Sequence, residues 1–313
     1  SAGDMNGDGL ADILVSGRKD DNLPDWAYVV YGSSNASNLT LTNLTIAANR
    51  GFRLQGSALG NGLSTAGDFN GDGLSDLIFG NDDTGSYSVV LGGTQWVTGA
   101  VSGAGAFSGS ASNEALIGSD GNDTMTGGGG ADRFFAGKGD DTIVLTASDV
   151  ANLQSNTRAA AKASVDGGTG FNTLRLSGGA NLDLNLISNL GAGGTEESSR
   201  IENISRIDLA TDSEANLLKI AAKDVGDMTG FNQIRIGSPS EDGQTWTNLS
   251  GTPLSTITRL KQVVIEGDNK DTVVLNTDEG VWADVGSASN GSHTYTVYQN
   301  DANHAQVLVR EGV

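Results

Sequence analysis

Apolar residues recur at short intervals along this chain, and glycine and aspartate fill much of the space between them. Over residues 118–144 the interval is nine, in three consecutive units that read GSDGNDTMT, GGGGADRFF and AGKGDDTIV. Every unit has Gly at position 4, Asp at position 6 and an apolar residue at position 8. The template G-G-x-G-x-D-x-U-x describes a coil in which six residues turn and three form a short strand. The pattern predicts a parallel β-roll whose core contains Met125, Phe134 and Ile143.

The residue types in these units favour calcium. Glycine permits positive φ, so six residues can turn with their carbonyl groups pointing inward. Aspartate supplies a hard anionic oxygen, which suits Ca²⁺. A flexible Gly/Asp linker would explain the glycines but not the period of nine. Leu116 falls at position 8 of the same frame, so residues 114–117 are expected to form a first rung.

A second motif, D-x-N-x-D-G-L-x-D, occupies residues 4–12 and 68–76, each time before an apolar strand. Oxygens at positions 1, 3 and 5 with glycine at 6 are typical of the start of an EF-hand loop. An EF-hand also needs Glu at position 12, where this chain has Val15 and Phe79, so the EF-hand is excluded. Two carboxylates 4 Å apart repel by about 4 kcal/mol at an effective dielectric of 20. We therefore expect two nine-residue calcium loops, each closed by its last aspartate; a metal-free Asx-rich turn is the alternative.

The segments after the two loops also correspond. Residues 27–32 (AYVVYG) match 86–92 (SYSVVLG), and 51–56 supply another strand, as expected for one propeller blade per repeat. Residues 1–93 resemble the FG-GAP repeats of integrin α-subunit propellers and of bacterial surface proteins. A closed propeller needs about four blades, so either further blades exist or the pair packs in another way. The resemblance implies the calcium ligands Asp4, Asn6, Asp8, Leu10 and Asp12, and likewise Asp68, Asn70, Asp72, Leu74 and Asp76.

The nonapeptide block resembles the RTX (repeats-in-toxin) β-roll of exported bacterial proteins. In that family each Ca²⁺ lies between one turn of the coil and the next-but-one turn. The resemblance implies that Asp123, Asp132 and Asp141 bind through their side chains. It also implies carbonyl ligands from Gly118, Asp120, Gly127, Gly129 and Lys138. Ala136 departs from the family pattern, because it replaces the first glycine of the third unit.

The sequence as a whole predicts an all-β protein in five parts. Two propeller-like repeats (1–93) lead through a small and polar linker (94–113) into the β-roll (114–180). The roll contains a helical insertion at 146–164 with Ser148 as its N-cap, and then returns to the template with Asn172 in place of aspartate. Residues 181–290 are expected to continue the solenoid, with an antiparallel sandwich as the alternative, because GFNTLRL at 170–176 recurs as GFNQIRI at 230–236. Residues 291–313 alternate as a β-hairpin cap.

Composition excludes several classes of function. The net charge is −20, with 38 acidic and 18 basic residues, so nothing basic is available to neutralise nucleic-acid phosphates. No cysteine is present and no apolar run approaches a membrane span. The only histidines are His293 and His304, both on the predicted hairpin, and no nucleophile, Walker or dinucleotide motif occurs. We therefore expect a binding protein without enzymatic activity.

Two functions fit these observations. The first is a structural and adhesive module at the C-terminal end of a large bacterial surface adhesin or extracellular fibre protein, exported by type I secretion and folded outside the cell by Ca²⁺. The second is the secretion and folding module of an RTX exoenzyme whose catalytic domain lies upstream. The expected partners are calcium and a cell surface, a polysaccharide or copies of the chain itself; Trp26 and Trp96 are candidate platforms for a sugar. The start at Ser1, almost inside a motif, indicates a segment of a longer protein, and residues 291–313 are a candidate export signal.

Overall fold

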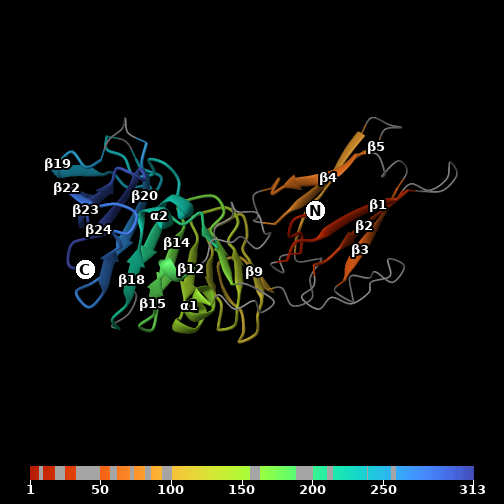
Figure 1. Cartoon of the computed structure of the whole chain (residues 1–313), viewed down its shortest axis with the longest axis horizontal. Coiled ribbons are helices and arrows are strands. Elements are labelled where there is room, and N and C mark those ends of the chain that lie inside the picture. Colours follow the sequence, from red (N-terminus) through yellow and green to blue (C-terminus); the bar gives the residue numbers. More distant parts are fainter. Residues whose placement is uncertain are drawn as a thin grey trace.

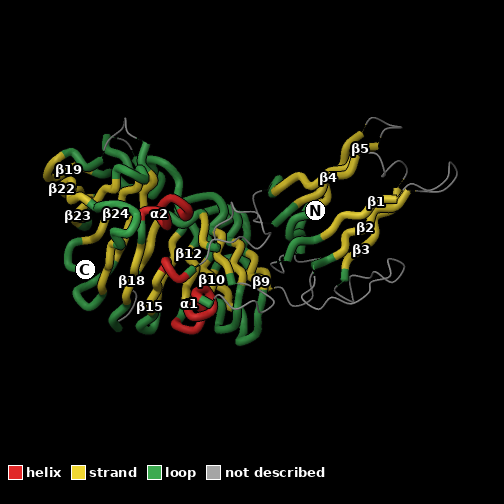
Figure 2. Tube along the Cα trace, viewed as in Figure 1, coloured by secondary structure: helices red, strands yellow, loops and turns green. Residues whose placement is uncertain are grey.

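A computed structural model provides the structure of this chain. It describes residues 1–6, 10–17, 25–32, 50–56, 62–70, 74–81, 86–93, 101–155, 163–187, 200–209, 214–237, 239–254 and 259–313. Short strands dominate these residues, and the helices are few and short, so the all-β prediction is confirmed (Figures 1 and 2). No helix among the described ranges is long and apolar enough to cross a membrane.

The nonapeptide block forms a coil of short parallel strands. Successive strands alternate between two sheets, because each six-residue turn carries the chain to the opposite side. One sheet contains β7 (Val101–Ser102), β9 (Ala115–Ile117), β11 (Arg133–Phe135), β13 (Ser164–Asp166) and β16 (Ile201–Glu202). The other contains β8 (Ala106–Ser108), β10 (Thr124–Thr126), β12 (Thr142–Leu145), β14 (Thr173–Leu176), β17 (Arg206–Asp208) and β20 (Lys261–Glu266). The apolar residues at position 8, Leu116, Met125, Phe134 and Ile143, are buried between the sheets as predicted.

The coil starts earlier than the sequence indicated. Residues 94–113 were predicted to be a linker, yet β7 and β8 lie within them and pair in parallel with β9 and β10. Phe107 packs against the core at the place that position 8 occupies in the later units. The linker prediction is therefore wrong for residues 101–113, because a strand of two or three residues needs only one apolar side chain.

After β14 the coil gains a third face. The strands β15 (Asn181–Asp183), β18 (Leu217–Ile220) and β21 (Thr272–Leu275) form a separate parallel sheet of three strands. A 3₁₀ turn (Leu184–Leu186) and helix α2 (Ala222–Met228) lie in the connections between faces. Helix α1 (Ala147–Gln154) lies in the connection between β12 and β13, and its N-cap is Thr146, not Ser148. The continued solenoid is confirmed as far as β21.

The predicted hairpin is confirmed as β23 (Thr294–Asn300) and β24 (Ala305–Arg310). It does not lie across the end of the coil as a separate cap, because β24 pairs in parallel with β20 and continues the sheet. The antiparallel strands β19 (Thr247–Gly251) and β22 (Ala283–Ser289) extend the same sheet to its far edge. The antiparallel strands thus belong to the same sheet as the solenoid and do not form the separate sandwich that was the alternative for residues 181–290. His293 and His304 lie at opposite ends of the hairpin, since Tyr295 pairs with Arg310 and Asn300 with Ala305.

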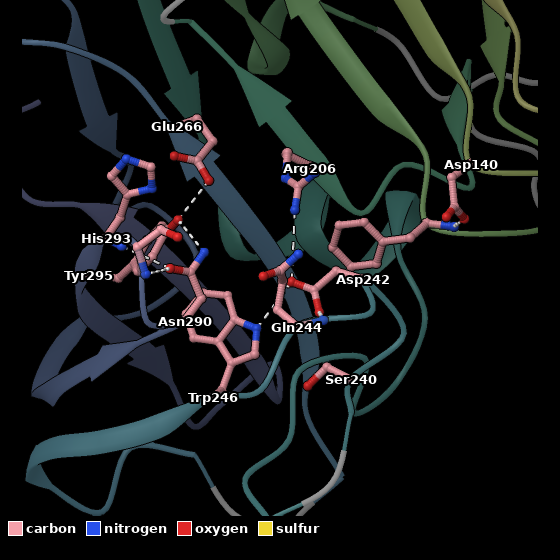
Figure 3. A network of polar contacts seen from close by, with 12 residues as sticks. Asp140, Arg206, Ser240, Asp242, Gln244, Trp246, Glu266, Asn290, His293 and Tyr295 are labelled. Carbon is pink, nitrogen blue, oxygen red and sulfur yellow. Dashed lines mark hydrogen bonds and ion pairs between the residues drawn. The ribbon is translucent and has the colours of Figure 1, made fainter.

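A second apolar core lies outside the coil, between the extended sheet and residues 231–254. Its largest members, Trp246 and Tyr295, are fully buried, with ring centroids 4.8 Å apart. Polar contacts surround it (Figure 3): Trp246 Nε1 donates to Asp242 Oδ2 at 3.0 Å, and the Tyr295 hydroxyl donates to Glu266 Oε1 at 2.7 Å. The guanidinium of Arg206 lies 3.7 Å from Asp242 and 4.9 Å from the ring centre of Phe171. These contacts fasten the 231–254 segment to the solenoid.

The N-terminal residues form two three-stranded antiparallel sheets. The first is β1 (Ile13–Gly17), β2 (Asp25–Val30) and β3 (Gly51–Gly56); the second is β4 (Gly62–Gly67), β5 (Asp76–Asn81) and β6 (Ser86–Val90). Their packing buries Met5, Val29 and Tyr31 of the first repeat beside Leu77 of the second. Leu74 packs in turn with Ala115, Ile117 and Phe135 of the roll. The two repeats therefore stack on each other and on the coil.

Candidate calcium sites

The turns of the roll gather at two edges. Edge A holds the turns 118–123, 136–141 and 167–172; edge B holds the turns 109–114 and 127–132, followed by helix α1. Turns at the same edge stack directly, because each complete turn of the regular coil takes 18 residues, as the Asp123–Asp141 contact shows. Position 6 of each turn consequently lies beside position 6 of the next-but-one unit.

A ladder of side chains at position 6 joins the stacked turns. The backbone N–H of Asp123 donates to Asp141 Oδ1 at 2.8 Å, and the N–H of Asp141 donates to Asn172 Oδ1 at 2.9 Å. On edge B, the N–H of Glu114 donates to Asp132 Oδ1 at 2.9 Å. Asp123, Asp132 and Asp141 are all buried. Each of these aspartates thus uses Oδ1 to hold the preceding turn, which leaves Oδ2 for another partner.

The second oxygen is not equally satisfied in the three aspartates. Asp123 Oδ2 accepts from the N–H and the hydroxyl of Ser119 at 2.6 and 2.9 Å. Asp132 Oδ2 and Asp141 Oδ2 are buried without any hydrogen-bond partner. A buried carboxylate oxygen without a donor is costly, because its lost hydration is not replaced. These orphaned oxygens fit a hard cation.

The first glycine of each turn shows where a cation would be held. A methyl group placed on Gly118 would lie 2.8 Å from Asp123 Oδ2 and 2.2 Å from the Ala136 carbonyl oxygen of the next-but-one turn. A methyl group on Gly109 would lie 2.5 Å from Glu114 Oε2 and 2.6 Å from the Gly127 carbonyl oxygen. A carboxylate and a carbonyl oxygen repel each other, and neither can donate a hydrogen bond. Ca²⁺, which takes six to eight oxygens, suits such pairs of oxygens.

Asn172, which takes position 6 in the last turn of edge A, makes hydrogen bonds with both polar atoms of its side chain. Its Nδ2 donates to the carbonyl oxygen of Asn203 at 3.1 Å, while its Oδ1 accepts from Asp141. The Asn203 carbonyl lies 2.2 Å from a methyl group placed on Gly167, just as the Ala136 carbonyl does at Gly118. The amide group supplies a proton where the aspartates have none. This rung closes with a hydrogen bond, and we expect it to need no cation.

The charge of the orphaned carboxylates is unfavourable as long as no cation is bound. Burial raises the pKa of Asp132 to about 7, and the charge of Asp149 adds to the shift. Burial also raises the pKa of Asp141 to about 7, and Asp123 and Asp140 add to it. Both shifts have desolvation as their main cause. A bound Ca²⁺ would remove this penalty.

The remaining predicted ligands of the roll lie on the same turns. Gly129 and Gly139 adopt positive φ, which allows the tight turn, whereas Ala136 stands at a position where no positive φ is needed and is buried in the core. Lys138 Nζ pairs with Asp120 Oδ2 at 3.1 Å on the exposed surface. Within the described ranges no three carboxylate or imidazole groups surround one point, so backbone carbonyls are needed to complete a shell. Carbonyl ligation by Gly118, Asp120, Gly127, Gly129 and Lys138 stays a prediction.

The two N-terminal loops share one arrangement. Asp12 accepts from the backbone N–H of Met5 and of Gly32, both at 2.9 Å. Asp76 accepts from the corresponding N–H groups of Phe69 and Gly92, both at 2.7 Å. The last aspartate, which the sequence predicted to close each loop as a metal ligand, closes it here by accepting from backbone donors. A carboxylate has further lone pairs, so metal ligation by Asp12 and Asp76 stays a prediction.

The other predicted ligands of these loops are only partly described. Asn6 is buried, Asp68 is exposed and Leu74 is fully buried in a core. In the first loop, Asp4 lies in the described range 1–6 and Leu10 begins the next range, 10–17; in the second loop, Asn70 ends the range 62–70. Asp8 and Asp72, at the centre of each motif, lie outside the described residues. The same holds for Trp96 and for the side chain of Trp26.

Comparison with known families bears on the roll. Residues 108–143 match the family described as RTX calcium-binding nonapeptide repeat, in four copies. This segment is an RTX repeat array. RTX nonapeptide repeats bind calcium ions, several where repeats follow one another. No curated protein and no solved structure matches the chain.

The four RTX copies reveal a residue that the sequence analysis missed. The match begins before the three regular units, and in that earlier copy Glu114 stands at position 6. Glu114 Oε2 accepts from the N–H of Ser110 at 2.6 Å, as Asp123 Oδ2 does from Ser119. Counting the frame of nine back from Asp123 would have identified it. Glu114 therefore serves the RTX array as a further acidic position 6.

Proposed function

We propose that this chain is a calcium-binding structural and adhesive module of a bacterial protein that type I secretion exports to the cell surface or the extracellular space. It acts by binding and not by catalysis, and Ca²⁺ folds its RTX array after export. The observation that carries the proposal is the pairing of a position 6 carboxylate with a carbonyl oxygen of the next-but-one turn, which Glu114 makes at Gly109 and the buried Asp123 makes at Gly118. The RTX match over residues 108–143 supports it.

The difference in calcium concentration between the inside and the outside of a cell controls when the array folds. The glycine-rich turns lose more backbone entropy on ordering than other residues would. The buried carboxylates of Asp132 and Asp141 oppose the fold further without a cation. A ligand that binds only the folded form stabilises it by RT ln(1 + [L]/Kd), about 2.7 kcal/mol at a hundredfold excess over Kd. Calcium is scarce inside a cell and abundant outside, so the array would fold after export.

An exposed apolar face supports the adhesive part of the proposal. The side chains of Ala27, Val29 and Tyr31 in the first repeat are buried. Their counterparts in the second repeat, Tyr87, Val89 and Leu91, are 78, 37 and 41% exposed, and Phe69 of the same repeat is 69% exposed. A cluster of exposed apolar side chains marks a surface that a partner can cover. The alternative, a folding module of an exoenzyme, would give this face no role.

Hydrogen exchange of the 313-residue chain tests the calcium switch. With chelator we expect the amides of residues 109–145 to exchange rapidly, and with Ca²⁺ we expect them to be protected. Mg²⁺ should not restore protection, because it requires near-ideal octahedral geometry and gives up water reluctantly. Equal protection with and without chelator would show that the array is a scaffold that needs no calcium.

A further inference from the structure

Helix α1 occupies the place of a regular turn at edge B. The third nine-residue unit ends at Val144. If the frame continued into residues 145–153, its position 6 would be Val150, which offers no carboxylate. The chain instead enters α1 directly after β12, against the turns at one edge of the coil (Figure 2). Asn152 of the helix donates through Nδ2 to the carbonyl of Gly130, which fastens α1 to the 127–132 turn.

Asp149, the third residue of α1, has one satisfied and one unsatisfied oxygen. Its Oδ2 accepts from the N–H and the hydroxyl of Thr146, both at 2.8 Å, and so caps the helix. Its Oδ1 is buried without a hydrogen-bond partner, and the residue is only 3% exposed. The helix cap therefore accounts for Oδ2 of Asp149 but leaves Oδ1 without a partner.

The free oxygens of Asp149 and Asp132 converge. A methyl group placed on Gly127 would lie 2.4 Å from Asp132 Oδ2 and 2.9 Å from Asp149 Oδ1. At Gly118 the corresponding point lies between Asp123 Oδ2 and the carbonyl of Ala136. Asp149 Oδ1 thus takes the place of the carbonyl that a regular next-but-one turn would supply. The two oxygens that face Gly127, Asp132 Oδ2 and Asp149 Oδ1, both lack a donor, whereas Ser119 supplies one to Asp123 Oδ2 at Gly118.

We infer that Asp132 and Asp149 hold one Ca²⁺ between the 127–132 turn and helix α1. Two buried carboxylates that face each other through oxygens without donors repel each other strongly, and a divalent cation neutralises both. The site lets the RTX array end on a helix without losing the ion of its last edge B turn. It rests on the proposed calcium binding and adds to it a ligand from outside the nonapeptide repeats.

Asp149→Asn in the 313-residue chain tests this inference. The Asn Oδ1 can still accept from Thr146, so the helix cap is retained, while Nδ2 can donate to Asp132 Oδ2 as Asn172 does to Asn203. We expect metal analysis after equilibrium dialysis to show one Ca²⁺ fewer per chain. We also expect a higher melting temperature in chelator than for the unchanged chain, because a hydrogen bond replaces the repulsion.

Asp224→Asn is the matched control. Asp224 caps α2 as Asp149 caps α1, since its Oδ2 accepts from the N–H of Ala221 at 2.8 Å, and it lies outside the RTX array. The control should retain the full calcium content. The double variant Asp132→Asn/Asp149→Asn should lose the same single ion as Asp149→Asn.

Three results would overturn the inference: full calcium content in Asp149→Asn, loss of an ion in Asp224→Asn, or loss of two ions in the double variant. The first would mean that Asp149 is not a calcium ligand. If the unchanged chain bound no Ca²⁺ at all, the proposed function would fail as well, so the two failures are distinguishable.

Discussion

Asp76 accepts a hydrogen bond of 2.7 Å from the backbone N–H of Gly92, and thereby joins the start of β5 to the residues that follow β6. Its other oxygen accepts from Phe69 at the same distance, so one buried carboxylate satisfies two backbone donors from separate segments. Asp12 repeats the arrangement with Gly32 and Met5. This closure fixes the geometry of both N-terminal loops.

Asp76→Asn should destabilise the N-terminal repeats. The amide would present Nδ2 to one of the two backbone N–H groups, which leaves a buried donor unsatisfied at a cost of about 1–3 kcal/mol. Urea unfolding followed by the fluorescence of the chain measures the change. Ser64→Ala, at an exposed position of the neighbouring β4, should change stability by less than about 0.5 kcal/mol. Equal effects of the two changes would contradict the closure role.

The calcium-free RTX array should be more stable at pH 5 than at pH 8. Burial raises the folded-state pKa of Asp132 and Asp141 from 3.8 to about 7. A raised carboxyl pKa means that the folded state binds protons more tightly than the unfolded state, so stability falls as pH rises from about 4 to 7. Melting temperatures in chelator across this range measure the effect. Asp132→Asn/Asp141→Asn should flatten the profile, and an unchanged slope would exclude these two groups.

Calcium should reverse this pH dependence. The ion binds the deprotonated carboxylates, so its affinity should increase as pH rises towards 7, with release of protons on binding. Calorimetry in buffers of different ionisation enthalpy counts the released protons. A calcium affinity that is independent of pH between 5 and 7 would mean that Asp132 and Asp141 are not ligands.

Glu202→Gln should stabilise the coil at pH 8 and leave it unchanged near pH 4. Burial raises the pKa of Glu202 to about 7, and the charge of Asp166 on the paired strand β13 adds to the shift. The charged form therefore opposes folding above this pKa, and glutamine removes that charge. Thermal unfolding at both pH values measures the difference. The exposed Glu311→Gln serves as control and should show no gain at pH 8.

The nine-residue period allowed the coil, its alternating strands and its inward apolar residues to be predicted. The prediction failed in the parts of the chain that depart from the nine-residue period. The third face with β15, β18 and β21 follows turns of irregular length, and the link from Asp141 to Asn172 already takes 31 residues instead of 18. Glu114 was missed because glutamate is not the residue of the template. Asp149 lies outside the frame altogether, so only its placement by α1 brings it to Asp132.

Tyr295→Phe should lower the free energy of unfolding by about 1–2 kcal/mol, because it removes a hydrogen bond to a charged acceptor at the second core. Burial is the main reason that the pKa of Tyr295 is raised, and its bond to Glu266 adds to the shift (Figure 3). Denaturant unfolding gives the change in stability. Tyr87→Phe, at a hydroxyl on an exposed ring, is the control and should be nearly silent. Comparable losses in both variants would contradict a role for the Tyr295–Glu266 bond.

Asn172→Asp should add a calcium requirement to a rung that has none. The change removes the Nδ2 donor to Asn203 and places a carboxylate against that carbonyl. We expect lower stability in chelator and about one additional Ca²⁺ per chain, by metal analysis. Asn203→Asp leaves the Asn203 carbonyl and Asn172 in place, so it should not add an ion by this route. Unchanged calcium content in Asn172→Asp would show that the acidity of position 6 does not decide ion binding.

Asn172 closes its rung with two hydrogen bonds, so we expect an Asp-to-Asn exchange at position 6 to convert a calcium-dependent turn into one that needs no metal. The calcium demand of such a coil would then be adjustable in single steps, turn by turn, while its backbone path stays the same. Exchanges between aspartate and asparagine at position 6 would then adjust such a chain to the calcium level of its surroundings. The number of acids at position 6 then sets how sharply the fold responds to that level.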